Sequence, residues 1–187
     1  MATGPGTFRE VDGEAVEMAD AKEAWTPFAR AALVRTAGKY RATITYKELG
    51  TEVQELSGIR TRMLLQHWIG DLLGLVSDEC RSAGEPLLSS LCVTSDGTVG
   101  PGYAKVISWV ETEGGKDVDD LAAEERLRCY EHFGATLPAD GGRPSLHPTL
   151  ARKREREMKA KIAARPRAVC PTCHMQVPTS GICDTCD

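Results

Sequence analysis

The sequence predicts a mainly α-helical domain with one small β-hairpin, followed by a cysteine module at the C-terminus. Three observations lead to this fold class. Apolar residues recur at the three- and four-residue spacing of helices in several segments of the first 134 residues. The short apolar run 87–93 is followed by the turn sequence 94–97 and by a stretch rich in Gly and Pro. Two Cys-x-x-Cys pairs lie in the last 18 residues.

The first helix is expected over residues 21–39. Trp25, Phe28 and Leu33 share one face at helical spacing, and Gly38 is a natural stop. Residues 1–20 combine glycines with several carboxylates, a composition that rarely supports a packed structure. We therefore expect residues 1–20 to be a disordered acidic N-terminus.

Two further helices are expected before the hairpin. Thr45 is followed three residues later by Glu48, the pattern of a capping box, and predicts a helix that continues to about Leu56. A longer apolar pattern predicts a second helix over residues 60–82. Gly70 and Gly74 inside that segment either allow close helix packing or divide it into two helices.

The hairpin completes a winged-helix-like arrangement over residues 21–134. Its strands are expected at residues 87–93 and 98–102, whereas residues 103–110 fit either a strand or a loop. A last helix is expected over residues 117–133. Two helices joined by a compact turn and followed by a hairpin are typical of winged-helix domains, in which the second helix faces the DNA major groove. An unrelated small α+β domain is the alternative.

Three short motifs follow one another within residues 44–105. They are Ile-Thr-Tyr-Lys-Glu-Leu at 44–49, His-Trp-Ile-Gly at 67–70, and Ser-Asp-Gly at 95–97 followed by Gly102-Tyr103. In these motifs the stretch resembles the DNA-binding domain of the O6-alkylguanine-DNA alkyltransferase and alkyltransferase-like family. The resemblance implies a DNA-binding domain of winged-helix type. It also implies that Tyr46, His67 and Tyr103 are the residues that face DNA.

The departures from that family concern its chemistry. Ser89 and Ser90 stand where the family has its acceptor cysteine and partner histidine, and His67 stands at the position of its base-flipping arginine. Cys92 lies three residues late, at the position of a valine. Because a reactive thiolate needs a neighbouring base, the resemblance implies DNA binding without alkyl transfer.

Charge is distributed unevenly along the chain. Residues 1–150 have a net charge of −8, residues 151–168 of +6 and residues 169–187 of −2, which give the total of −4. Residues 135–149 read as a Pro/Gly linker and residues 150–168 as a basic helix. Such a basic block suits DNA phosphates. The residues predicted to contact nucleic acid are Tyr46, Lys47, Arg60, Arg62, His67, Tyr103, Arg152, Lys153, Arg154 and Arg156.

The two cysteine pairs, Cys170 with Cys173 and Cys183 with Cys186, are separated by nine residues. Four thiolates at this spacing suit one tetrahedral Zn²⁺ and predict a zinc ribbon over residues 169–187. The loop between the pairs is too short for a hydrophobic core, so the metal would supply its folding energy. With every position filled by sulfur, the zinc would be structural. The apolar surroundings of the other cysteines, Cys80, Cys92 and Cys129, predict buried thiols.

These features predict a non-catalytic DNA-binding protein. The acidic balance of residues 1–150 keeps a second reading open, a zinc-ribbon adaptor that binds a protein partner in a DNA-processing or regulatory complex. An enzyme using Ser89 or Cys92 is the weakest reading, because the sequence has no nucleotide-binding loop and no nucleophile-elbow motif. We find no apolar run long enough for a membrane span and no signal peptide, so a cytoplasmic protein is expected.

Overall fold

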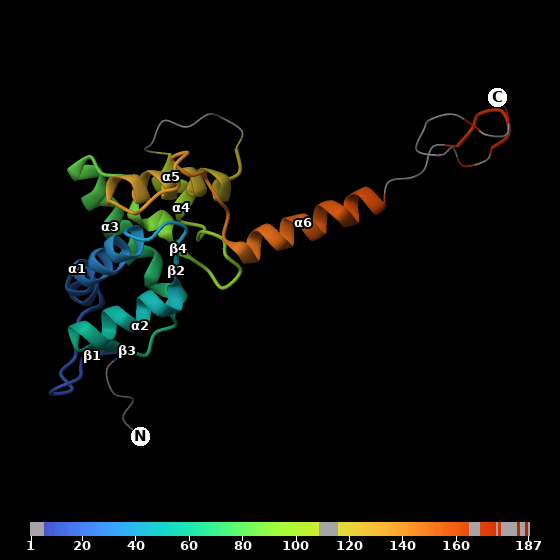
Figure 1. Ribbon diagram of the computed structural model, residues 1–187. Helices are drawn as coiled ribbons and strands as arrows, with labels where there is room; N and C mark the ends of the chain where they lie inside the picture. Colours follow the sequence, from blue (N-terminus) through green and yellow to red (C-terminus); the bar gives the residue numbers. More distant parts are fainter. Residues whose placement is uncertain are drawn as a thin grey trace, which may run out of the picture. The chain divides into compact units, whose positions relative to one another are not determined.

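The computed structural model describes residues 6–108, 116–164, 169–174, 176, 183 and 186. The chain forms two compact units, Met1–Leu150 and Ala151–Asp187. Figure 1 shows that the first unit is built mainly of helices, as the sequence predicts. None of its described helices, nor the helix that leads into the second unit, is both long and apolar enough to cross a bilayer.

The first unit is organised around helix α1 (Met18–Ala37). Trp25, Ala29 and Leu33 follow one another by four residues on its buried face, and all three are fully inaccessible. The Trp25 ring lies against Trp68, with ring centroids 4.6 Å apart. Helices α2 (Tyr46–Ser57) and α3 (Ile69–Ala83) both pack on α1, so this helix is the centre of the core.

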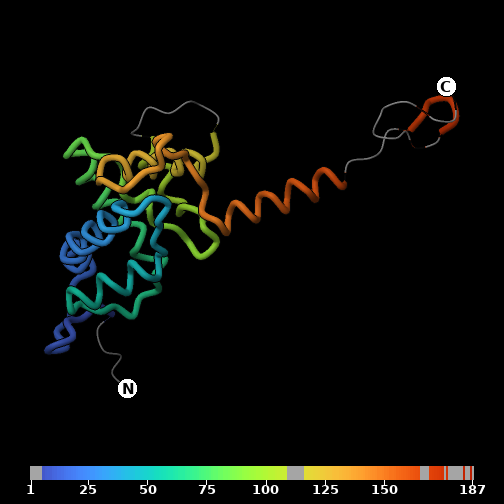
Figure 2. Tube along the Cα trace, viewed as in Figure 1, coloured from blue at the N-terminus to red at the C-terminus, as the bar shows by residue number. Residues whose placement is uncertain are grey.

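The N-terminal segment is ordered from residue 6, and the prediction of a disordered stretch over residues 1–20 is wrong there. Strand β1 (Thr7–Arg9) pairs antiparallel with β3 (Ile59–Thr61), and the two run side by side in Figures 1 and 2. The hydroxyl groups of Thr7 and Thr61 are 2.9 Å apart. The backbone of β3 needs hydrogen-bond partners, and β1 supplies them. Residues 1–5 lie outside the described part.

Helix α2 begins as predicted, at a capping box. The Glu48 backbone N–H donates to Thr45 Oγ1 at 3.2 Å, and the Thr45 backbone N–H donates to Glu48 Oε2 at 2.8 Å. The helix ends at Gly58, which has φ 68° and so adopts the left-handed conformation that favours glycine. Local sequence alone therefore fixes both ends of this helix.

The helix predicted over residues 60–82 is wrong in its first part. Residues Ile59–Thr61 belong to β3, and the 3-10 turn η1 (Leu65–His67) precedes α3. Neither Gly70 nor Gly74 allows a close approach, because a Cβ at either position would meet nothing within 4 Å. The close approach occurs at Gly50 in α2 instead, where a Cβ would lie 2.6 Å from Leu65 Cδ1.

The predicted β-hairpin is also wrong. Residues Leu88–Leu91 form the 3-10 turn η2, and the short strand β4 (Cys92–Val93) pairs in parallel with β2 (Ile44–Thr45). The turn at 94–97 forms as expected, with Gly97 at φ 82°. The Val99 N–H then donates to Asp119 Oδ1 at 2.8 Å, so it is not available to a second strand. The wing is missing from the described residues, and the winged-helix assignment is not confirmed.

Two of the three remaining helices lie where the sequence predicts them. Helix α4 (Tyr103–Ile107) stands where a strand or a loop was expected. Helix α5 (Val118–His132) lies within the predicted range 117–133, and the Asp117 side chain caps its start. Helix α6 (Pro148–Ala163) forms within the segment predicted as a basic helix, of which residues 165–168 lie outside the described part, and its Leu150 is buried.

Candidate metal centre and nucleic-acid interface

The four C-terminal cysteines lie together. The sulfur atoms of Cys170, Cys173, Cys183 and Cys186 are all within 4.8 Å of one another, and those of Cys173 and Cys183 are 3.5 Å apart. A tetrahedral Zn²⁺ with Zn–S bonds of about 2.3 Å places its ligands roughly 3.8 Å apart. The cluster is therefore compatible with a metal site, and it consists of the four residues that the sequence predicts.

Backbone turns hold the two cysteine pairs in place. The His174 N–H donates to the Cys170 carbonyl at 2.9 Å, and the Cys186 N–H donates to the Cys183 carbonyl at 3.4 Å. Hydrogen bonds from the backbone of Cys173 and Thr172 lower the pKa of the Cys170 thiol to about 6. A thiolate is the form that binds a metal, so the fold prepares this ligand. His174 is exposed and is not part of the cluster.

The three residues that the resemblance directed towards DNA have different surroundings. Tyr103 is only 5% exposed, so the expectation that its ring faces DNA is wrong. The Tyr46 ring is half-buried beside Gly100, and burial raises the pKa of its hydroxyl to about 12. His67 is exposed at the end of η1. The structure thus brings none of the three side chains together with another.

The predicted basic contacts of the first unit are dispersed. Arg60 pairs with Glu10 at 3.1 Å, and the Arg62 guanidinium lies 5.1 Å from the centre of the Phe8 ring. Lys47 is exposed near the start of α2. No basic surface forms along the described residues of α3, which carries Asp71, Asp78 and Glu79 as well as Arg81. The helix expected to enter the major groove is therefore mostly acidic.

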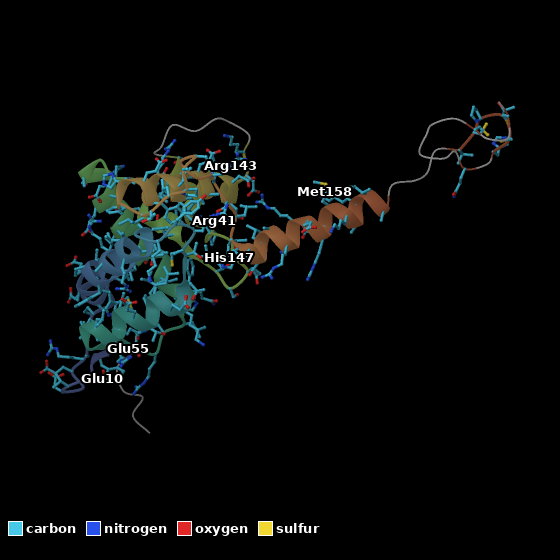
Figure 3. All side chains as sticks on the ribbon, in the orientation of Figure 1. Glu10, Arg41, Glu55, Arg143, His147 and Met158 are labelled. Atoms are coloured by element: carbon cyan, nitrogen blue, oxygen red, sulfur yellow. The ribbon has the colours of Figure 1, made fainter. Side chains whose placement is uncertain are left out.

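The basic residues of α6 lie on an exposed helix. Arg152, Lys153 and Arg156 are exposed, and Arg154 is half-buried. Arg152, Arg156 and Lys159 follow one another by four and three residues and so share one face. Lys159 also pairs with Glu155 at 2.6 Å, one of the expected helical pairs. Exposed Met158, labelled in Figure 3, lies outside this basic face by the same periodicity.

The two serines that the resemblance aligns with the acceptor cysteine and its partner histidine are buried. Ser89 is 4% exposed, and its hydroxyl is 2.7 Å from that of Ser77. Ser90 is fully buried and lies 3.7 Å from the Cys129 sulfur. Burial raises the pKa of the Cys92 and Cys129 thiols well above the ordinary range. These groups have the surroundings of core residues, as predicted for the cysteines.

Sequence reasoning missed a group of side chains around Tyr40. The Tyr40 hydroxyl accepts a hydrogen bond from the Arg143 N–H at 2.9 Å and donates one to the Arg143 carbonyl at 3.2 Å. The Arg41 guanidinium lies 5.2 Å from the centre of the Tyr40 ring. Residues 40 and 143 are far apart in sequence and lie in irregular segments, so no periodicity could have revealed this contact.

Comparison with known proteins adds no relative. No protein-family model, no curated protein and no solved structure matches this chain.

Proposed function

We propose that this chain is a non-catalytic DNA-binding protein whose main contact with the duplex is the basic helix α6. The observation that carries the proposal is the separation of charge. Residues 151–168 have a net charge of +6, whereas residues 1–150 have −8. Phosphate neutralisation by Lys and Arg supplies most of the sequence-independent affinity for DNA. A helix with Arg152, Arg156 and Lys159 on one exposed face provides such a surface.

The charges of the first unit favour α6 over α3 as the main contact with DNA. The acidic side chains of α3 would repel phosphates, and Arg60 is already neutralised by Glu10. Among the predicted contacts of this unit, Lys47, Arg62 and His67 are exposed and have no carboxylate partner within the described residues. We propose that they make secondary contacts, and that the half-buried Tyr46 contributes only at the margin.

We further propose that the cysteine cluster binds one structural Zn²⁺ and thereby fixes the end of the basic segment. The four sulfur ligands and the lowered Cys170 pKa support zinc. A closed four-sulfur site offers no open position for a reacting group. The buried surroundings of Ser89, Cys92 and Cys129 likewise favour a protein without a nucleophile.

A salt titration tests the DNA-binding proposal. The full chain should bind a short duplex with an affinity that falls steeply between about 50 and 200 mM salt. The variant Arg152→Gln/Lys153→Gln/Arg156→Gln should reduce the salt slope by about two to three. The matched control Lys22→Gln/Arg30→Gln/Arg35→Gln removes three positive charges from residues paired closely with carboxylates in the first unit and should leave the slope unchanged. Absence of duplex binding at low salt contradicts the proposal.

A protein adaptor is the second candidate function, and one observation favours it. A groove of about 670 Å³ beside α1 and α3 is lined by Glu23, Asp78 and Glu79 together with Thr26, Leu75, Ser82 and Ala83. An acidic groove suits a basic protein segment better than DNA. Retention of a partner after nuclease treatment, with loss on truncation of the last 20 residues or on Asp78→Asn/Glu79→Gln, would favour the adaptor.

A further inference from the structure

We infer that the first unit holds a second phosphate-binding surface for duplex DNA, formed by Lys39, Arg41 and Arg143 around Tyr40. We call these four residues the Tyr40 clamp. The inference rests on the proposed function, because it assigns a second contact to the same ligand. It concerns only residues of the first unit, and Arg41 and Arg143 are both labelled in Figure 3.

Tyr40 joins two segments that are distant in sequence. Its hydroxyl exchanges hydrogen bonds with both backbone groups of Arg143, and its ring lies edge-on to Tyr130 with centroids 5.7 Å apart. The Tyr130 hydroxyl donates to the Ala42 carbonyl at 2.7 Å. Gly142 stands close to the Tyr40 ring, where a Cβ would lie 2.9 Å from the hydroxyl oxygen. The ring and the backbone that present the basic side chains are therefore held in place.

Arg41 occupies an unfavourable backbone conformation. It has φ 63°, and the Ala42 N–H donates to the Lys39 carbonyl at 3.0 Å, which places Arg41 third in a tight turn. Glycine or asparagine is preferred at such a position, because other residues pay a steric cost there. An exposed arginine at this position is best explained by a use for its side chain. Its guanidinium stacks on Tyr40, which orients it while its N–H groups stay available.

The clamp also stands out by its lack of neutralisation. Most cations of the first unit are paired with a carboxylate, for example Lys22 with Asp71 and Arg35 with Glu52. Lys39 and Arg41 are exposed and have no carboxylate partner within the described residues. Arg143 makes only a long contact of 3.7 Å with Asp140, and its side chain is 83% exposed. In a unit of net charge −8, cations without a close carboxylate partner are the groups that can meet phosphates.

The choice of ligand follows from geometry. An arginine guanidinium binds a phosphate through two parallel N–H groups, and lysine adds a point charge. Three cations on a turn and a neighbouring segment suit a phosphodiester backbone, which presents phosphates in succession. Arg143 also shortly precedes Pro148, where the helix with the basic face begins. The clamp thus adds phosphate contacts that the sequence does not predict.

Two substitutions test the clamp without disturbing the fold. Arg41→Gly removes the charge and relieves the unfavourable φ, so the melting temperature should be no lower than that of the wild type. Arg143→Gln removes the second charge, while both hydrogen bonds to Tyr40 persist because they involve the main chain. The matched control Lys22→Gln/Arg35→Gln removes the same charge from residues that pair closely with Asp71 and Glu52.

The readout is the salt dependence of binding to a short duplex by the full chain. Arg41→Gly/Arg143→Gln should lower the salt slope by about two and the affinity at 0.1 M salt by roughly ten- to hundredfold. The control should keep the wild-type slope. A clamp variant with the wild-type slope overturns this inference and leaves the proposed function intact. A wild-type chain without duplex affinity overturns both.

Discussion

The core of the first unit and the cysteine module are stabilised in different ways. The core buries large side chains, among them Trp25, Trp68 and Leu72, each at most 1% exposed. In the described part of the cysteine module, Cys170 is the only buried residue. Burial of apolar surface stabilises the first unit without a ligand. The described residues of the module form no comparable core, so we expect its fold to depend on a metal bound by the sulfur atoms.

The difference separates stability from function. The first unit folds around apolar side chains and neutralises most of its own cations, which leaves few charges for a ligand. The second unit has little to bury and displays its cations on α6. The first unit, with its large core, therefore provides a rigid scaffold, whereas the second unit provides exposed cations. Four predictions test this comparison.

Metal removal should have the largest effect. Chelation, or Cys183→Ser, should unfold the cysteine module, because structural zinc supplies about 10–16 kcal/mol of binding free energy in small zinc modules. Metal analysis should give one ion per wild-type chain, and amide signals of the first unit should not move. Cys80→Ser, which alters a buried thiol outside the cluster, should leave the metal content unchanged. Unchanged module signals after chelation would contradict the prediction.

Loss of a core aromatic should affect the other region. Trp25→Ala should lower the free energy of unfolding of the first unit by about 3–5 kcal/mol, because it leaves a cavity beside Trp68. Metal content should stay at the wild-type level. Leu56→Ala is the control, since Leu56 is 56% exposed and should change stability by less than about 1 kcal/mol. Equal losses from the two variants in denaturant unfolding would argue against this core.

Arg126 tests a buried charge within the same unit. It is 2% exposed and donates to the Ser90 carbonyl at 3.0 Å and to the Ser145 carbonyl at 3.4 Å. Arg126→Met leaves these acceptors without their donor and should cost about 2–3 kcal/mol of unfolding free energy. Arg35→Met removes an exposed arginine paired with Glu52 and should cost less than about 1 kcal/mol. Urea titration of the two variants compares them, and a neutral Arg126→Met would refute the role.

The capping box should have the smallest effect, and that effect should depend on pH. Thr45→Ala should cost about 1 kcal/mol. Hydrogen bonds from Thr45 lower the pKa of Glu48, so its contribution is present above its ordinary pKa and is lost as the pH falls through the lowered value. Glu48→Gln should therefore destabilise the chain at pH 7 and converge on the wild type in acid. Glu55→Gln, an exposed change in the same helix, should show no such convergence. Thermal melts of the variants and the wild type, from pH 7 down through the lowered pKa of Glu48, measure these differences.

Local signals predicted part of the fold. The capping box acts through two residues only three positions apart, Thr45 and Glu48, so the sequence identified the start of α2 correctly. The predictions of a helix over residues 60–82 and of a β-hairpin were wrong for a common reason. Residues 59–61 are extended because β1 pairs with them, and β4 pairs with the distant β2. Pairing between distant segments overrides local periodicity and leaves no mark in it.

The candidate sites also differ in whether nearby or distant residues determine them. The four cysteines were predictable because two short pairs joined by a short loop leave the metal geometry little freedom. The basic helix was predictable because it is a block of like charge. The prediction that Tyr103 faces DNA was wrong because its side chain, on α4, is buried in the core. The Tyr40 clamp went unseen because it joins residues 39–41 to residue 143.

The sequence by itself determined the helical content, the cysteine cluster and the uneven charge, because each depends on residues close together along the chain. Tertiary structure alone decided which cations are free. Arg60 was predicted to contact DNA, yet its guanidinium pairs with Glu10, which directly follows β1. No ion pair neutralises the Arg41 guanidinium in the described residues, because the group beside it is the Tyr40 ring and not a carboxylate. Whether a charge is neutralised depends on distances of a few ångströms between segments, and those distances exist only in the folded chain.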